Sequence, residues 1–227
     1  MEKPKKHQRV NDILLGPLER PALQWLAAHM PAWMTPDKLT SIGVLGTLVT
    51  LAGYILSRQA AGWLWLASLG FVINWFGDSL DGTLARHRHI ERPVFGFYID
   101  HVVDTACQIL MFVGLGVSPY ITFNVAMVAL VGYQAMALLV YTLTYVVGEY
   151  RISYGKLGPT EVRVVAILAN ACMFFFGVVY VNFNLPWVGG VTVGIYDLLV
   201  GAVAFLLFGF FLNSAWQKGK ELRKSGA

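Results

Sequence analysis

Residues 78–104 read DSLDGTLARHRHIERPVFGFYIDHVVD, and this stretch places four aspartates inside otherwise apolar, membrane-length sequence. Asp78 and Asp81 lie three residues apart. Asp100 and Asp104 lie four apart, so each pair occupies one face if its surroundings are helical. An ionised carboxylate at membrane depth costs about 2.5 kcal/mol or more, and neighbouring carboxylates also repel one another. The stretch therefore predicts two helices whose aspartates converge on a compensating cation.

The residues around the aspartates indicate which cation and which ligand such a site would take. Carboxylate oxygens are hard ligands, and no cysteine or histidine pair has ligand spacing here, which favours Mg²⁺, Mn²⁺ or Ca²⁺ over zinc. Magnesium usually shares its coordination shell with substrate phosphates. Gly82 and Ala85 have small side chains or none, so a ligand could approach the helix backbone closely there. Arg86 offers a planar charged group for phosphate. The stretch therefore predicts a phosphate-binding surface beside the metal.

The order of these residues resembles the signature of a known family. The pattern D-x-x-D-G-x-x-A-R, followed after nine residues by G-x-x-x-D-x-x-x-D, resembles the signature of the CDP-alcohol phosphotransferases. The resemblance implies an integral membrane enzyme of six helices, often a homodimer. It also implies metal-dependent transfer of a phospho-alcohol from a CDP-linked donor to a hydroxyl, with release of CMP. The matching residues are Asp78, Asp81, Gly82, Ala85, Arg86, Gly96, Asp100 and Asp104.

The same resemblance implies roles for individual residues. Two divalent ions, Mg²⁺ or Mn²⁺, would be held by Asp78, Asp81, Asp100 and Asp104. Nucleotide and phosphate would be bound by Gly82, Ala85, Arg86, Asp78 and Thr40. The family often has Pro-Asn-x-x-Thr near the nucleotide, and this chain departs from that pattern at Asp37. A helix start, with Thr35 as its cap and Pro36 in the first turn, explains the same residues equally well.

Two further features resemble the choline and ethanolamine phosphotransferase branch. His101 directly follows the third signature aspartate, and Gly158-Pro159-Thr160-Glu161 precedes a later apolar run. The resemblance implies that His101 acts as general base, assisted by Glu161. Asp104 is the alternative base if it is not fully occupied as a metal ligand. A Gly-Pro turn with a glutamate in the first helical turn is also an ordinary helix start.

Two substrate directions fit this chemistry. In the leading one, the donor is a CDP-amino alcohol such as CDP-ethanolamine or CDP-choline, and the acceptor is the hydroxyl of diacylglycerol or ceramide. In the alternative, CDP-diacylglycerol is the donor and inositol, serine or a glycerol phosphate is the acceptor. A phosphorylated acceptor would need extra basic residues, and Arg151, Lys156 and Arg163 are available.

A transporter or channel is a third, more remote interpretation, because membrane carboxylates can also form an ion or proton pathway. That interpretation predicts charge distributed through the membrane depth, whereas the acidic residues of this chain gather toward one side. An enzyme is therefore the favoured class.

The composition is that of a membrane protein. Of 227 residues, 56% are hydrophobic and only 13% are charged, too apolar for a soluble domain. The net charge of +4 comes from scattered basic residues without the clustered patch that nucleic acid requires, so no nucleic-acid partner is expected. The expected partners are the CDP-linked donor, the lipid or alcohol acceptor, the bilayer and a second copy of the chain.

Hydropathy and charge predict how the chain crosses the membrane. If both termini are cytoplasmic, every lysine and arginine except Arg58 lies on the cytoplasmic side, as the positive-inside rule requires. The aspartates then lie at the cytoplasmic ends of their helices. The predicted spans, each near the roughly 20 residues that a bilayer requires, are 39–57, 62–86, 94–117, 120–147, 160–181 and 193–216.

The predicted fold class is therefore all-α, integral and multi-pass, with six membrane-spanning helices. Residues 1–35 are expected to form one or two amphipathic helices on the membrane surface, with Trp25 and Trp33 at headgroup depth. Residues 36–217 form the six-helix phosphotransferase domain, and residues 218–227 form a basic tail.

Overall fold

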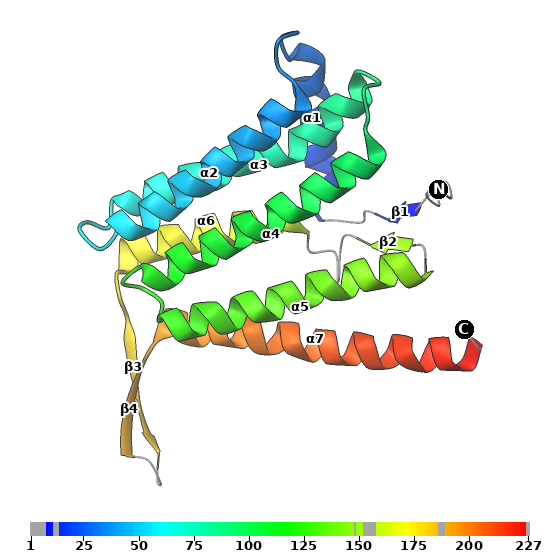
Figure 1. The fold of residues 1–227 in the computed structure, drawn as a ribbon. Helices are drawn as coiled ribbons and strands as arrows, with labels where there is room; N and C mark the ends of the chain where they lie inside the picture. Colours follow the sequence, from blue (N-terminus) through cyan, green and yellow to red (C-terminus); the bar gives the residue numbers. More distant parts are fainter. Residues whose placement is uncertain (1–7, 11–13, 148, 152–157, 186–188, 226–227) are drawn as a thin grey trace.

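The computed structural model describes residues 8–10, 14–147, 149–151, 158–185 and 189–225, and helices dominate this part of the chain (Figure 1). The predicted helical fold class is confirmed, with two small two-stranded sheets in addition. In chain order the elements are β1 (Gln8–Val10), α1 (Gly16–His29), α2 (Pro36–Leu56), α3 (Trp63–His87), α4 (Pro93–Val117), α5 (Phe123–Val147), β2 (Glu149–Arg151), α6 (Pro159–Phe176), β3 (Tyr180–Leu185), β4 (Gly189–Gly194) and α7 (Ile195–Ser225).

Three helices that build the site begin at a proline. Pro36, Pro93 and Pro159 occupy the first turns of α2, α4 and α6, where the missing N–H costs nothing. At α2 the cap is Thr35, whose Oγ1 accepts a hydrogen bond from the backbone N–H of Lys38 at 3.3 Å. The helix start expected from Thr35 and Pro36 is therefore confirmed.

Helices α2 and α3 pack with their backbones in contact. A Cβ added to Gly46 of α2 would lie 2.4 Å from the backbone nitrogen of Asn74, and one added to Gly77 of α3 would lie 2.3 Å from that of Gly43. Small residues permit such close approach between membrane helices, where van der Waals packing replaces the hydrophobic effect as the main attraction. The pair forms the support from which Asp78 and Asp81 project.

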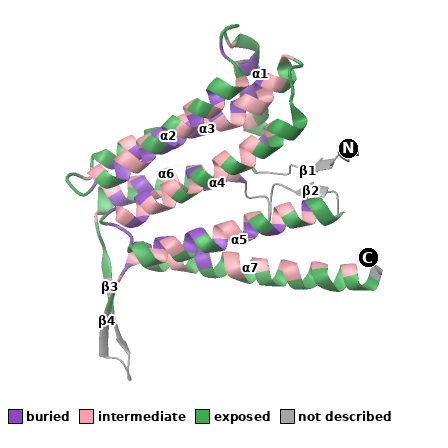
Figure 2. Ribbon diagram, viewed as in Figure 1, coloured by how far each residue is buried: buried purple, intermediate pink, exposed green. Residues whose placement is uncertain are grey.

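Helices α1, α4 and α6 pack on this pair, and α5 and α7 lie beyond α4 (Figure 1). α4 packs along α2, α6 packs on α3, and α5 contacts both α4 and α7 (Figure 1). Buried residues concentrate where the helices meet, and exposed residues face outward, as Figure 2 shows. A buried polar link joins three helices, because Tyr54 donates to Asn170 at 3.0 Å and Asn170 donates to Ser68 at 3.2 Å. Apolar side chains cover much of the outer surface, as a bilayer requires.

Five of the described helices are long and apolar enough to cross a membrane: α2, α4, α5, α6 and α7. α3 has 25 residues but carries Asn74 near its middle and Asp78 and Asp81 in its second half, and it is not among the five. The protein is therefore an integral membrane protein with at least these candidate spans.

Helix α1 is tied to the same end of the bundle as the signature aspartates. Its Glu19 Oε1 accepts hydrogen bonds from Trp75 Nε1 of α3 and from Thr160 Oγ1 of α6, both at 2.8 Å. Leu23 and Ala27 are buried against the ends of α2 and α3. The N-terminal segment thus contains a helix, and this helix connects α3 to α6. Its predicted amphipathic position on the membrane surface stays a prediction.

The structure corrects the predicted boundaries near the C-terminus. The helix predicted over 160–181 ends at Phe176, because Gly177 adopts a φ of 65° that breaks the helix. Strands β3 and β4 then form an antiparallel hairpin that extends from the helical body (Figure 1). The last helix runs from Ile195 to Ser225, so it continues into the basic segment. Lys156, counted among the cytoplasmic basic residues, lies outside the described residues.

Candidate functional site

Three of the four signature aspartates converge. Asp78 of α3 and Asp100 and Asp104 of α4 each place a carboxylate oxygen within 4.8 Å of the other two, and all three are half-buried. Oxygens on opposite sides of a divalent cation at 2.0–2.6 Å lie about 4 to 5 Å apart, so the spacing suits a shared ion. The residues therefore fit a divalent cation with oxygen ligands.

Asp81 lies outside this three-carboxylate group and is held by protein donors. Thr40 Oγ1 donates to Asp81 Oδ2 at 2.6 Å, and the Gly82 backbone N–H donates to Asp81 Oδ1 at 2.5 Å. Thr40 thus contacts the site through Asp81, joining the start of α2 to α3. The roles of Asp81 as a metal ligand and of Thr40 at the nucleotide stay predictions.

The signature arginine lies across the bare helix face. Arg86 Nη2 donates to Thr83 Oγ1 at 3.1 Å, and a Cβ added to Gly82 would lie 3.3 Å from Arg86 Nη1. A side chain at position 82 would therefore displace this guanidinium. Ala85 is half-buried, and a Cβ added at Gly96 would meet nothing within 4 Å. The space beside Gly96 is open, whereas Arg86 covers Gly82. The role of these residues in binding phosphate stays a prediction.

A second arginine, Arg163 of α6, reaches into the acidic cluster. Its Nη2 donates to Asp78 Oδ2 at 2.5 Å, and its Nε donates to Asn74 Oδ1 at 2.8 Å. Asn74 is buried and donates in turn to the Gly43 carbonyl at 3.1 Å and to Thr47 Oγ1 at 3.2 Å. From the sequence alone, Arg163 is expected only to help set the orientation of the chain in the membrane and to be available to a phosphorylated acceptor. Its position in the first turns of an apolar helix, two residues after Glu161, was the available signal.

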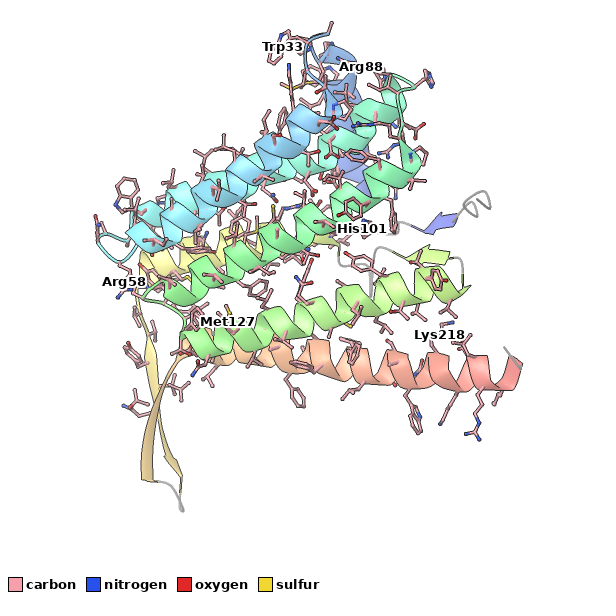
Figure 3. All side chains as sticks on the ribbon, viewed as in Figure 1. Trp33, Arg58, Arg88, His101, Met127 and Lys218 are labelled. Atoms are coloured by element: carbon pink, nitrogen blue, oxygen red, sulfur yellow. The ribbon has the colours of Figure 1, made fainter. Side chains whose placement is uncertain are left out.

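His101 lies between α4 and α5 beside the acidic cluster (Figure 3). Its ring contacts Phe97 and Tyr141, with centroid separations of 4.0 and 4.6 Å. Nδ1 lies 2.7 Å from the Phe97 carbonyl oxygen, which can only accept, so Nδ1 carries the proton in this contact. In the neutral ring Nε2 is then the acceptor, as a general base requires.

Glu161 is buried and engaged on both carboxylate oxygens. Oε2 accepts the Gly158 N–H at 2.9 Å, and Oε1 accepts the Leu15 N–H at 2.7 Å. The carboxylate therefore caps the start of α6 and fastens it to the segment before α1. Its predicted assistance to His101 stays a prediction.

The position where the chain departs from the family pattern also has a partner. Asp37, which replaces the usual asparagine, forms an ion pair with Arg92 at the start of α4. Both side chains are well exposed, so the pair contributes little stability. It does join the two helix starts that flank the site.

A model of the CDP-alcohol phosphatidyltransferase family matches residues 33–210. The chain belongs to this family. The matched region contains every predicted site residue, from Thr40 to Glu161, and it also contains Arg163.

This CDP-alcohol phosphatidyltransferase chain is similar to curated relatives of more than one kind. Cholinephosphotransferase 1 of Danio rerio is 26% identical over 201 residues, which are 82% of this chain and 50% of the relative. Cholinephosphotransferase 1 of Gallus gallus is 28% identical over 188 residues, which are 78% and 54%. Phosphatidylinositol phosphate synthase of Cutibacterium acnes is 34% identical over 90 residues, which are 39% and 40%. The chain spans about half the length of the curated relatives it matches.

A cavity of about 560 Å³ lies at the opposite end of the bundle from the family signature. It is lined by the α2–α3 and α4–α5 connections and by the residues around β3 and the start of α7, including Arg58 and Asp197. Asp197 Oδ1 accepts the Thr122 N–H at 2.7 Å, so this carboxylate serves as a structural acceptor. The acidic cluster is therefore the better candidate for the chemistry.

Proposed function

We propose that this protein transfers a phospho-alcohol group from a CDP-amino alcohol, such as CDP-choline or CDP-ethanolamine, to the hydroxyl of diacylglycerol or ceramide, releasing CMP. The observation that carries the proposal is the convergence of Asp78, Asp100 and Asp104 within 4.8 Å. The family match and the two cholinephosphotransferases that cover about four fifths of the chain support this donor and acceptor.

The cofactor in this proposal is a pair of Mg²⁺ or Mn²⁺ ions. Asp78, Asp100 and Asp104 would hold them. Asp81 would be the fourth ligand once the hydrogen bond from Thr40 Oγ1 to its carboxylate is released. Bound ions would supply positive charge to the donor's diphosphate and to the departing CMP. Hard carboxylate ligands without sulfur favour these metals over zinc.

The protein's own residues would position the donor and move the proton. Arg86, Gly82, Ala85 and Thr40 would bind the nucleotide and its phosphates. As the acceptor oxygen bonds to the phosphorus that carries the alcohol, the bond from that phosphorus to the oxygen of CMP breaks. The acceptor's proton would pass to His101 Nε2, with Asp104 as the alternative base and Glu161 assisting His101.

Replacing His101 with alanine is expected to lower CMP release at least 100-fold, because general-base catalysis contributes about 10² to 10⁴ in rate. The KM for the CDP-linked donor should change less than threefold, since the proposed role begins only after binding. Steady-state kinetics at saturating Mn²⁺ would measure both. Normal turnover in this variant would remove His101 as the base and favour Asp104.

The membrane arrangement is also part of the proposal. α3 would be the sixth span, both termini would be cytoplasmic, and the site would face the cytoplasm. Leu14, Leu18, Trp25 and Trp33 are exposed on or beside α1, which supports a surface position for residues 1–35. Residues 36–217 would form the catalytic membrane domain and residues 218–227 a basic tail at the headgroups. The enzyme would act as a homodimer.

The alternative is a CDP-diacylglycerol donor with a soluble alcohol acceptor such as inositol, serine or glycerol phosphate. The partial similarity to a phosphatidylinositol phosphate synthase supports it, but that match covers 39% of the chain. The transporter interpretation loses its support, because the chain belongs to a family of transferases.

CMP release by the purified protein tests the proposal. CDP-choline, CDP-ethanolamine and CDP-diacylglycerol would each be crossed with diacylglycerol, ceramide and soluble alcohols, with Mg²⁺, Mn²⁺ or a chelator. The expected result is metal-dependent release from a CDP-amino alcohol only when a lipid hydroxyl is present. Release only from CDP-diacylglycerol with a soluble alcohol would overturn the substrate assignment and leave the metal site standing.

A further inference from the structure

The guanidinium of Arg163 is held in place by two hydrogen bonds, and one of its nitrogens has no partner among the described residues. Nη2 bonds Asp78, and Nε bonds Asn74, which is anchored to α2 through two bonds of its own. Nη1 is buried and has no hydrogen-bond partner among the described residues. Because the guanidinium is planar and rigid, the two existing bonds fix the direction in which Nη1 points.

An unpaired buried donor of this kind calls for an acceptor. Buried polar groups in folded proteins are almost always hydrogen-bonded, and one left unsatisfied at a charged side chain is costly. Arg163 lies beside Asp78 and interacts electrostatically with Asp104, two members of the three-carboxylate group. The missing acceptor would therefore sit at the edge of the metal site.

Two other arginines near this end of the bundle, Arg88 and Arg86, provide a contrast. Arg88 donates to three backbone carbonyls of the α1–α2 connection, those of Met30, Pro31 and Met34, at 2.5 to 2.9 Å. Its role is therefore structural, because it holds this connection against the end of α3. Arg86 is exposed and bonds Thr83 on its own helix. Of the three, Arg163 combines burial, contact with a proposed metal ligand and an open donor.

We propose that Arg163 is a substrate-binding residue, and that its Nη1 donates to a phosphate oxygen of the CDP-linked donor. The hydrogen bonds from Nη2 to Asp78 and from Nε to Asn74 fix the orientation of the guanidinium. This inference rests on the proposed function, because it requires a diphosphate to bind at the three-carboxylate group. It adds a fixed protein cation from α6 to the three carboxylates of α3 and α4.

Direct binding of CDP at saturating Mn²⁺ tests the role of Arg163. In Arg163→Lys and Arg163→Gln, the Kd for CDP should rise about 10- to 100-fold, because a charge-assisted hydrogen bond is lost and neither side chain reproduces the fork. The matched control is Arg88→Lys, which changes a structural arginine at the same end. Its Kd should stay within threefold of the wild-type value, even where its thermal midpoint falls.

Two comparisons make the outcome decisive. Mn²⁺ affinity without nucleotide should change less than threefold in Arg163→Lys; an equal loss of Mn²⁺ and CDP affinity would show that Arg163 only positions Asp78. Unchanged CDP affinity in both Arg163 variants would also overturn the inference. Failure of the wild type to bind CDP would instead count against the proposed function.

A structure of the wild-type protein with CDP and Mn²⁺ gives a second, independent test that does not depend on variant folding. Arg163 Nη1 is expected within about 3.2 Å of a phosphate oxygen. An Nη1 that bonds protein or water, with every phosphate oxygen beyond hydrogen-bond distance, would overturn the inference.

Discussion

Replacing Asp104 with asparagine is expected to abolish CMP release while leaving the protein folded. Asparagine has nearly the same shape, so the packing of α4 is kept, but the negative charge that would hold the metal is lost. Second-shell changes at metal sites typically cost about 10- to 100-fold, so loss of a direct ligand should cost at least 100-fold. Activity at increasing Mn²⁺ concentrations and the thermal unfolding midpoint would be measured together.

Asp197→Asn is the matched control for this substitution. It makes the same chemical change at the opposite end of the bundle, and asparagine keeps a carbonyl oxygen that can accept the Thr122 N–H. Its CMP release should stay within threefold of the wild-type rate. The metal-site account would be contradicted if Asp104→Asn retained activity comparable to this control.

Replacing Gly46 with alanine is expected to destabilise the protein strongly. The added Cβ would lie 2.4 Å from the Asn74 backbone nitrogen and 2.8 Å from the Gly70 carbonyl oxygen, so the backbones of α2 and α3 must separate. Overpacking costs about 1–3 kcal/mol, which lowers the thermal midpoint by about 2 to 12 °C for a chain of this size. Thermal unfolding in detergent measures the change.

Gly209→Ala on α7 is the control for Gly46→Ala. A Cβ at Gly209 would meet nothing within 4 Å, so only the better helix propensity of alanine should act there. Its midpoint should be unchanged or slightly raised. If Gly46→Ala were as stable as this control, the close backbone contact between α2 and α3 would not be the basis of their packing.

Local sequence patterns predicted much of this protein. The spacing of Asp78, Asp100 and Asp104 predicted a converging cluster because helical periodicity and two adjacent helices are enough to bring them together. Thr35 and Pro36 predicted the start of α2 for a similarly local reason. Apolar length predicted most helices to within a few residues, since a bilayer requires continuous hydrophobic segments.

Features that depend on tertiary contact were not predicted. The pairing of Arg163 with Asp78 joins residues 85 positions apart, and the position of Arg163 near the start of an apolar helix does not identify its partner. Asp81 was grouped with the other aspartates because its spacing suited them, yet Thr40, 41 positions away, engages it. The ends of the β3–β4 hairpin carry Tyr180, Val181 and Val193 next to apolar helices, so hydropathy alone assigned these ends to the helices.

We propose that Asp78, Asp100 and Asp104 hold a divalent cation at the site of transfer. The most direct test is to locate Mn²⁺ by anomalous X-ray diffraction from crystals of the wild-type protein. A Mn²⁺ peak is expected in contact with all three carboxylates, and this peak should be lost in Asp104→Asn. Mn²⁺ bound elsewhere on the protein, with no peak between these three aspartates, would contradict a metal site at this position.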